Sequence, residues 1–412
     1  MGSITSGTKR YRQINLAFFA AGFVTFITLY DVQPLLPVFA REFGVTAAMG
    51  SLPLSLSTCA LAIAMLFAGT ISESFGRKRV MVASLVVTSL LALLTSLTHT
   101  LPALLALRLL QGIALAGLPA VAMAYLSEEI APASLTSAIG LYISGNALGG
   151  MTGRIFTATV TEFVSWRAAL CAIGIFCLAL SLHFARSLPP SANFKRRPFA
   201  ARYLFSSLAQ QLRDPGLLCL YGISFLIMGS FVTLYNYITF RLLAPPYFLS
   251  QSLVSLIFLV YLFGSFSSSM VGRQVERFGR SRMLLLTMTT MAVGALATLS
   301  HGVAGIVAGI ALFTCGFFGA HTVASSWVGS RARTARAQAA SLYLFSYYFG
   351  SSVSGTVGGI FWSRYGWRGV VVLILALLAA GCCLVRRLTA RSEAGTLQAA
   401  RSRALAPCAA EE

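Results

Sequence analysis

The most informative feature of this chain is how little charge it carries. Only 10% of its 412 residues are charged, and Asp and Glu together number 11, whereas a soluble domain usually carries about 25% charged residues. Hydrophobic residues make up 57% of the chain, which is more than a soluble protein of this length could bury while keeping a wettable surface. The composition therefore argues against a soluble globular protein and predicts one that lies within a lipid bilayer.

The sequence also lacks the motifs of an enzyme, an ATP-driven pump or a receptor. It contains no HExxH, GxSxG or GxxxxGK[ST] pattern, and its four histidines lie in different segments. Its eight cysteines show no CxxC or other metal-ligand spacing, so we expect no metal and no cofactor. The longest predicted loop has fewer than about 30 residues, which leaves no room for the soluble sensory domain that a receptor usually carries.

The net charge of +20 does not predict nucleic-acid binding. The Lys and Arg residues lie in short loops between apolar runs and build no continuous basic face. If the N-terminus is cytoplasmic, 24 of the 31 basic residues fall on the cytoplasmic side. The positive-inside rule therefore predicts an inner-membrane protein that crosses the bilayer many times, with both termini in the cytoplasm.

Twelve apolar runs are each long enough to cross a bilayer, which takes roughly 20 residues. Within lipid the backbone must satisfy its own hydrogen bonds, so these runs are predicted to be helices. They cover, approximately, residues 14–38, 50–72, 80–98, 101–127, 134–160, 167–187, 215–241, 250–271, 281–300, 303–329, 336–361 and 367–388.

A proline-rich, basic segment divides the runs into two groups of six. We therefore predict a six-helix bundle in residues 1–188, a cytoplasmic linker in residues 189–214 with a surface helix near 203–212, and a second bundle in residues 215–390. The Ala- and Arg-rich residues 391–412 are predicted to be a disordered cytoplasmic tail.

The two groups repeat each other. Residues 69–80 read GTISESFGRKRV and residues 272–283 read GRQVERFGRSRM, so Gly, Glu, Gly and Arg recur at an offset of 203 residues. Trp166-Arg167 and Trp367-Arg368 match at an offset of 201. Two bundles in the same orientation are the arrangement of transporters built from parallel repeats.

These motifs resemble the signature of the major facilitator superfamily, G-x-x-x-D-R-x-G-R-R/K, which lies between helices 2 and 3 of that family. The resemblance implies twelve helices in two bundles related by a pseudo-twofold axis, and a cytoplasmic gate in which the acid and the basic cluster hold the inner mouth shut. A small Gly in helix 2 would let the other bundle approach closely. The implied gate residues are Gly69, Glu73, Gly76, Arg77, Lys78, Arg79, Glu128, Glu129, Gly272, Glu276, Gly279 and Arg280.

Further sequence motifs resemble particular branches of this family. RLLQG at 108–112 resembles the helix 4 signature, and GNALGGMTGR at 145–154 resembles a degenerate helix 5 signature of antiporters. YLSEEIAP, GLYISGN and SLYLFSYY are similar to the YnfM-type branch of the drug:proton antiporter family. The resemblance implies a monomeric transporter that uses a proton gradient to export a lipophilic or cationic drug-like molecule. A sugar or metabolite permease, working by efflux or by proton symport, is the alternative.

Two ionisable residues within predicted spans are candidates for proton coupling. Asp31 lies near the outer end of the first span and Arg108 at a similar depth in the fourth, and both helices line the central cavity in the family that the chain resembles. Asp31 would stay ionised beside Arg108 and would take up a proton if Arg108 moved away. The structural alternative is that Arg108 braces carbonyl groups and Asp31 caps a helix.

Polar and aromatic side chains in the spans are candidates for the substrate cavity, since a polar group there needs a partner or water. Arg154 could hold an anionic substrate, pair with Glu162 or extend toward the membrane surface. The remaining cavity candidates are Tyr30, Tyr142, Asn146, Tyr235, Asn236, Tyr261, His321, Tyr343 and Tyr347.

Overall fold

The computed structural model describes residues 4–194, 196, 201–332 and 334–405, with the backbone alone at residues 201, 203 and 391–405. Within these residues every extended regular element is a helix, and the single β-type contact is a bridge between Ile4 and Ile130. The structure thus confirms the all-α fold that the sequence predicts.

The first bundle contains eight α-helices and one 3₁₀ helix. They are α1 (Lys9–Tyr30), η1 (Gln33–Leu35), α2 (Leu36–Glu42), α3 (Ala47–Phe75), α4 (Arg77–Ser96), α5 (Leu101–Leu115), α6 (Pro119–Glu129), α7 (Pro132–Phe163) and α8 (Trp166–Ser187).

The second bundle follows the linker helix α9 (Ala201–Leu212), which packs against α10 and α15. Its elements are α10 (Pro215–Leu243), α11 (Gln251–Ser255), η2 (Leu256–Val260), α12 (Tyr261–Phe278), α13 (Arg280–Ala297), α14 (Val303–Arg331) and α15 (Arg336–Leu405).

These elements form twelve transmembrane helices. In the described part of the chain nine segments are long and apolar enough to span a membrane, and the last of these, Arg336–Ala390, has 55 residues. It holds two spans, because Gly366 breaks α15 with a φ of 60°. The other two spans are α7 and α13, whose hydropathy is lowered by small and hydroxyl residues in α7 and by two arginines at the start of α13.

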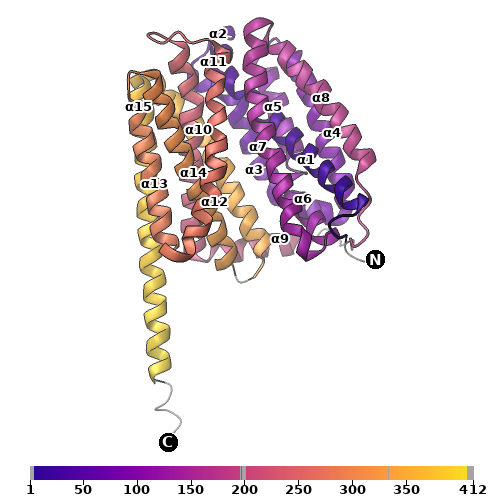
Figure 1. Cartoon of the computed structure of the whole chain (residues 1–412), viewed down its shortest axis with the longest axis vertical. Coiled ribbons are helices and arrows are strands. Elements are labelled where there is room, and N and C mark those ends of the chain that lie inside the picture. Colours follow the sequence, from indigo (N-terminus) through magenta and orange to yellow (C-terminus); the bar gives the residue numbers. More distant parts are fainter. Residues whose placement is uncertain (1–3, 195, 197–200, 333, 406–412) are drawn as a thin grey trace, which may run out of the picture.

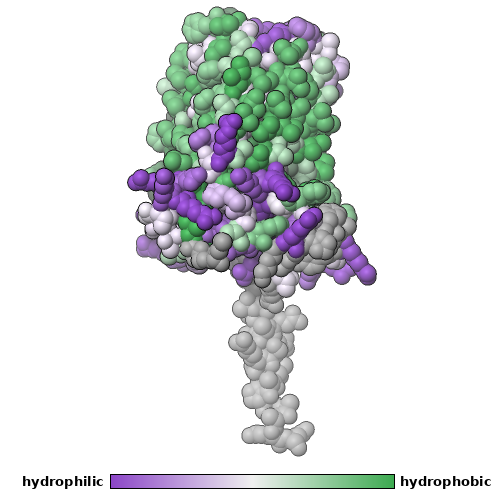
Figure 2. Space-filling model, turned by 90° about the vertical axis from the view of Figure 1, so that its right-hand side faces the viewer, coloured by the Kyte–Doolittle hydropathy of each residue, from purple (hydrophilic) through white to green (hydrophobic). Residues whose placement is uncertain are grey.

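Both termini lie at the same end of the molecule, which we call the terminal face; the opposite end is the far face (Figure 1). Figure 2 shows a broad hydrophobic surface over most of the height of the bundles, with hydrophilic side chains gathered toward the terminal face. A hydrophobic belt of this kind matches the hydrocarbon layer of a bilayer.

The two bundles are held together near the far face. The packed pairs that join them include α3 with α15, α7 with α11, and α2 with α10. Several hydrogen bonds join the bundles toward this face. They connect Gln33 to Asn236, Gln251 to Pro34, Ser252 to Glu162, and both Ser352 and Thr356 to Ser55.

Glycines shape the turn between the second and third spans of each bundle. Gly76 and Gly279 separate the helices with φ values of 99° and 82°, which only Gly adopts readily. Gly69, in contrast, has no atom within 4 Å of the position that a Cβ would occupy. The expected close approach of the other bundle to Gly69 is therefore absent in this structure, because the bundles meet toward the far face.

The C-terminal region corrects one prediction. The sequence predicts a disordered tail over residues 391–412, but α15 continues as a helix to Leu405. Ala, Leu, Gln and Arg dominate this stretch and have high helix propensities. Residues 406–412, like residues 195 and 197–200 of the predicted linker, lie outside the described residues.

Candidate functional site

A buried ion pair joins two helices of the first bundle. Asp31 follows the last residue of α1 and Arg108 lies in the middle of α5. Both are 1% exposed, and Nη1 of Arg108 lies 3.2 Å from Oδ1 of Asp31. Pro34 ends α1 here, because it has no N–H to donate to the carbonyl group of Tyr30.

Arg108 also satisfies carbonyl groups that the end of α1 leaves open. A helix end has unpaired C=O groups and a partial negative charge, both of which attract a guanidinium. Besides Asp31, Arg108 donates to the carbonyl oxygens of Thr28 (3.0 Å), Leu29 (2.8 Å) and Pro53 (3.2 Å) and to Oε1 of Gln111 (2.6 Å). The structure therefore combines the ion pair and the carbonyl brace, which the sequence analysis treated as alternatives.

Arg154 on α7 lies in the interior, 2% exposed. Its Nε donates to Oε1 of Gln33 at 2.6 Å and its Nη1 donates to the carbonyl oxygen of Gly150 at 2.7 Å. Glu162, one of its expected partners, instead accepts hydrogen bonds from Ser252. Neither the pairing with Glu162 nor the extension toward the membrane surface occurs.

Three aromatic rings surround the guanidinium of Arg154. Its Cζ lies 4.0 Å from the ring centroid of Tyr30, 4.9 Å from that of Phe258 and 5.1 Å from that of Tyr261. These are distances at which a ring face stabilises a cation. Since Tyr30 belongs to the first bundle and the other two rings to the second, this aromatic cage spans both bundles.

The side chain of Gln33 connects Arg154 to the second bundle. Its Oε1 accepts from Arg154, and its Nε2 donates to Oδ1 of Asn236 on α10 at 2.8 Å. Gln33 is 1% exposed and Asn236 is fully buried, so a polar chain of three side chains crosses the interface between the bundles.

An aromatic cluster continues from the cage into the second bundle. Tyr235 stacks on Phe258 with centroids 5.4 Å apart, and its hydroxyl hydrogen-bonds to that of Thr314 at 2.7 Å. Further toward the terminal face, the hydroxyl of Tyr343 lies 3.0 Å from Nδ1 of His321.

The ring of Tyr347 lies 4.9 Å from that of His321. The rings of Phe231 and Phe317 connect this end of the cluster to Tyr261. The structure therefore brings six of the cavity candidates into one group with Arg154: Tyr30, Tyr235, Tyr261, His321, Tyr343 and Tyr347.

Tyr142 and Asn146 lie apart from this group. Tyr142 is 4% exposed and contacts Phe18 edge-on at 6.2 Å within the first bundle. Asn146 packs against Gly22 of α1. Both therefore face the packed seam between α1 and α7, which sequence position alone did not distinguish from a cavity wall.

The first copy of the repeated motif forms an ion-pair cluster at the terminal face. Nη2 of Arg77 lies 2.8 Å from Glu128 and 3.8 Å from Glu73, and its Nη1 donates to Oγ of Ser72 at 2.5 Å. Arg77 is 7% exposed, and Glu129, 1% exposed, accepts from the backbone N–H of Asn193 at 2.9 Å. Every one of these contacts lies within the first bundle and the start of the linker.

Lys78 and Arg79 line a pocket of about 790 Å³ beside this cluster. In the second copy of the motif, the methyl of Thr322 lies 3.8 Å from the position that a Cβ on Gly272 would occupy, and Glu276 is exposed.

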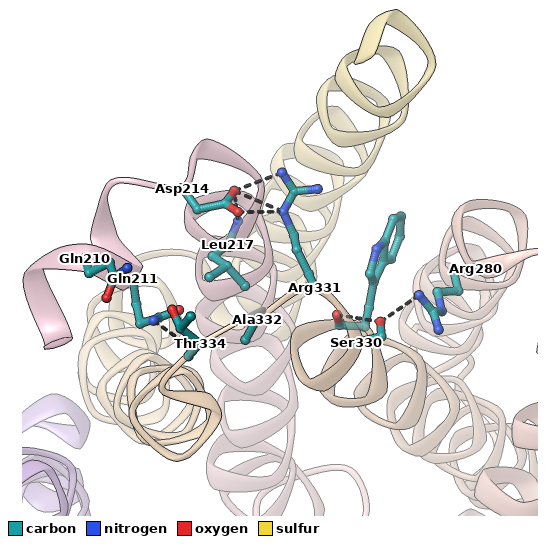
Figure 3. A pocket seen from close by; sticks show the side chains of 10 residues that line it. Gln210, Gln211, Asp214, Leu217, Arg280, Ser330, Arg331, Ala332 and Thr334 are labelled. Atoms are coloured by element: carbon teal, nitrogen blue, oxygen red, sulfur yellow. Dashed lines mark hydrogen bonds and ion pairs between the residues drawn. The ribbon is translucent and has the colours of Figure 1, made fainter. Parts of the chain in front are cut away.

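The second copy of the motif has different hydrogen-bond and ion-pair partners, which lie around a pocket of about 420 Å³ (Figure 3). Arg280, which corresponds to Arg77, donates to Oγ of Ser330 at 2.7 Å instead of to a carboxylate. The carboxylate of this region, Asp214, pairs with Arg331 at 2.9 Å. Burial raises the pKa of Asp214, but hydrogen bonds from Arg331 and from two backbone N–H groups at the start of α10 lower it by more, so that it lies below its ordinary value.

Gln33 and Phe258 are site residues that were not among the candidates predicted from the sequence. Gln33 could have been found, because a Gln between Asp31 and Pro34 within an apolar span is as unusual as the residues that were chosen. Phe258 carried no such signal, since the chain has 29 Phe residues and most apolar positions look alike. Only its approach to Arg154 distinguishes it.

Comparisons with known proteins agree with this architecture. A family model described as Major Facilitator Superfamily matches residues 15–249 and 226–409. The chain is 50% identical over 378 residues to an uncharacterized MFS-type transporter, YybF, of Bacillus subtilis (strain 168), covering 92% of this chain and 94% of that protein. It is 47% identical over 392 residues to the inner membrane transport protein YnfM of Escherichia coli (strain K12), covering 94% of both.

Among solved structures, the nucleoside transporter NupG matches with a TM-score of 0.72 at 14% identity, over 92% of this chain and 99% of that one. At this identity the likeness speaks for the fold alone.

Proposed function

The chain belongs to the major facilitator superfamily and is a membrane transporter of small molecules; from this premise we propose that it exports a small organic molecule from the cytoplasm in exchange for protons. The observation that carries the proposal is the buried pair of Asp31 and Arg108. Ionisable groups inside a membrane protein are costly and are usually retained for function.

The pair offers a mechanism for coupling. The contact with Arg108 favours the charged form of the Asp31 carboxylate over the neutral form. Four neutral acceptors remain around Arg108 when Asp31 is neutral, so the guanidinium keeps hydrogen bonds while the carboxyl carries a proton. Binding of a proton by Asp31 then weakens one of the contacts that tie α1 to α5, which links protonation to the packing of these two helices.

The proposed transport cycle is alternating access by rocking of the two bundles. The distribution of the basic residues supports an orientation with both termini in the cytoplasm. The far face then faces outward, and it is the side where the hydrogen bonds join the bundles. In this arrangement we expect the substrate to enter from the cytoplasmic side, and we propose that a single polypeptide carries out transport.

The substrate is better described as a polar metabolite than as a lipophilic cation. The aromatic cluster suits both, but a cation would need a free carboxylate, and Asp31 is fully engaged by Arg108. Arg154 adds a second positive charge within the cage and repels a cation. This geometry supports the metabolite-permease alternative over the cationic drug, and proton-driven efflux remains the proposed direction.

Purified protein in liposomes with an imposed pH gradient tests the proposal. Candidate dyes, antibiotics, pentoses and short organic acids are added, and substrate-induced proton movement is followed with a trapped pH-sensitive dye. We expect coupled movement in wild type and its loss in Asp31→Asn, with Glu42→Gln, at a surface ion pair, as the control. Coupling that persists in both Asp31→Asn and Arg108→Ala would contradict the proposed site.

A further inference from the structure

Arg154 is a buried cation without a counter-ion. It is 2% exposed, and no Asp or Glu oxygen of the described residues lies within 4.0 Å of it. Its Nε and one Nη1 hydrogen are used by Gln33 and Gly150, while Nη2 donates to none of the described residues. A guanidinium carries five N–H donors, so most of its hydrogen-bonding capacity is unused.

The surroundings of Arg154 differ from those of Arg108, which is also buried. That guanidinium, equally buried, contacts a carboxylate and four further acceptors. A protein interior normally supplies such partners, because an unpaired buried charge is strongly destabilising. The aromatic cage of Arg154 offsets part of this cost but supplies no negative charge. This environment is typical of a residue whose charge is neutralised by a bound ligand.

Two more donors without partners belong to the same polar group. Nδ2 of Asn236 is buried and has no hydrogen-bond partner in the described residues, although Oδ1 of the same amide accepts from Gln33. The hydroxyl of Tyr261, whose ring belongs to the cage, is also buried without a partner. All three unpaired groups can donate, and none is a carboxylate, so the missing ligand is an acceptor and an anion.

We propose that Arg154, Asn236 and Tyr261 bind the carboxylate of a small organic acid, which is the transported substrate. This assignment rests on the proposed function, in that it names the substrate class of the same cavity. A carboxylate fits a guanidinium with two parallel hydrogen bonds. It also neutralises the single charge of Arg154, whereas a doubly charged phosphate would leave an excess negative charge among aromatic rings.

The site joins both bundles, which gives bound carboxylate a place in the transport cycle. Arg154 belongs to α7, Tyr261 to α12 and Asn236 to α10. A carboxylate held by all three links the bundles, and the rings of Tyr30 and Phe258 lie beside it to contact the organic part of the acid. Uncharged analogues of the same shape keep the ring contacts but lose the guanidinium.

Binding to the full-length protein in detergent, without any gradient, tests the assignment. Benzoate, salicylate, pyruvate and gluconate are each compared with their amides, and benzylamine and inorganic phosphate are included, with the unfolding temperature and isothermal calorimetry as readouts. We expect at least one carboxylate, but not its amide, to stabilise wild type. Arg154→Gln is expected to weaken this binding by at least about 30-fold, as for other buried charge pairs.

Gln33→Glu is the sharper variant, because it keeps the size of the side chain and places a carboxylate on Nε of Arg154. It should raise the unfolding temperature without ligand and abolish the response to carboxylates. Arg241→Gln is the matched control: Arg241 also lacks a carboxylate but lies near the far face, where it donates to the carbonyl groups of Thr298 and Ser300 and to the hydroxyl of Tyr247. It should bind carboxylates as wild type does.

The assignment is overturned if no carboxylate stabilises wild type more than its amide, if phosphate or benzylamine is preferred, or if Gln33→Glu keeps the wild-type response. Because binding is measured without a proton gradient, this outcome is independent of coupling. Carboxylate binding together with uncoupled transport would leave the site intact and remove only the proton-exchange part of the proposed function.

Discussion

Removing either charge of the Asp31–Arg108 pair alone should strongly lower the free energy of unfolding. Removing both charges should cost less than the sum of the two single costs. Both side chains are 1% exposed, so either single variant leaves a charge buried without its counter-ion. Asp31→Asn keeps the shape and one acceptor oxygen but removes the negative charge. We expect it to lower the free energy of unfolding by about 3–5 kcal/mol, the cost of breaking a buried pair, with the four neutral acceptors of Arg108 placing it toward the lower figure.

Arg108→Gln should cost a similar amount, or less where Asp31 takes up a proton. The double variant removes both charges, so its cost should fall short of the sum of the single costs by about 2–3 kcal/mol. The assay is unfolding by SDS in mixed micelles at neutral pH, followed by tryptophan fluorescence. A double-variant cost equal to the sum within about 0.5 kcal/mol would refute the reasoning, since it would mean that the two charges do not interact.

An ion pair of the same bond type elsewhere in the chain supplies the control. Arg167 and Glu42 lie 2.8 Å apart at the far face, but each is 32% exposed. Exposed pairs contribute at most about 1 kcal/mol, so Glu42→Gln should be close to wild type. Glu42 also accepts a hydrogen bond from Nε1 of Trp166 at 2.5 Å, which the amide oxygen of a Gln can still accept. The contrast between the two pairs therefore tests burial as the cause.

Three other outcomes follow from the described contacts. In a background without native cysteines, Ser55→Cys combined with Thr356→Cys should cross-link between the bundles and block transport, since the two hydroxyl oxygens lie 2.9 Å apart; free transport after complete cross-linking would count against a moving far face. Gly76→Ala should cost about 1 kcal/mol or more, because φ is 99° there, while Gly69→Ala, with open space around it, should unfold like wild type in the same SDS titration. Asp214→Asn should lose less than about 1 kcal/mol near neutral pH, because the pair of Asp214 is partly exposed. Since the folded pKa of Asp214 is lowered, that loss should be full above about pH 4 and vanish as the pH falls through the folded pKa; a difference that grew on acidification would contradict the sign.

The apolar runs of the sequence determined the helices and their number. A bilayer leaves the backbone no alternative to helix, so length and hydropathy alone were sufficient for most spans. Gly366 lies between the last two predicted spans and divides α15, whereas the first predicted span, 14–38, ran past Pro34 and past the end of α1 at Tyr30. The tail was misjudged because a polar composition was read as disorder, while its helix propensity was not weighed.

The sequence also put Asp31 and Arg108 at the same depth, because depth in a membrane follows from counting residues along a helix. What counting cannot provide is the direction in which each helix is rotated. Tyr142 and Tyr347 look alike in sequence, yet one packs within the first bundle and the other joins the aromatic cluster of the second.

Tertiary structure alone decided which polar groups meet across the two bundles. The contact from Arg154 through Gln33 to Asn236 joins residues more than 200 positions apart, and no local pattern encodes it. In the described part of the chain no carboxylate lies beside Arg154, and packing decided this too. The sequence offered Glu162, but the packing of α7 against α11 brings the Glu162 carboxylate to Ser252. Hydrophobicity placed the helices in the membrane. The packing of the helices and bundles against one another determined which charges are paired and left Arg154 without a carboxylate partner among the described residues.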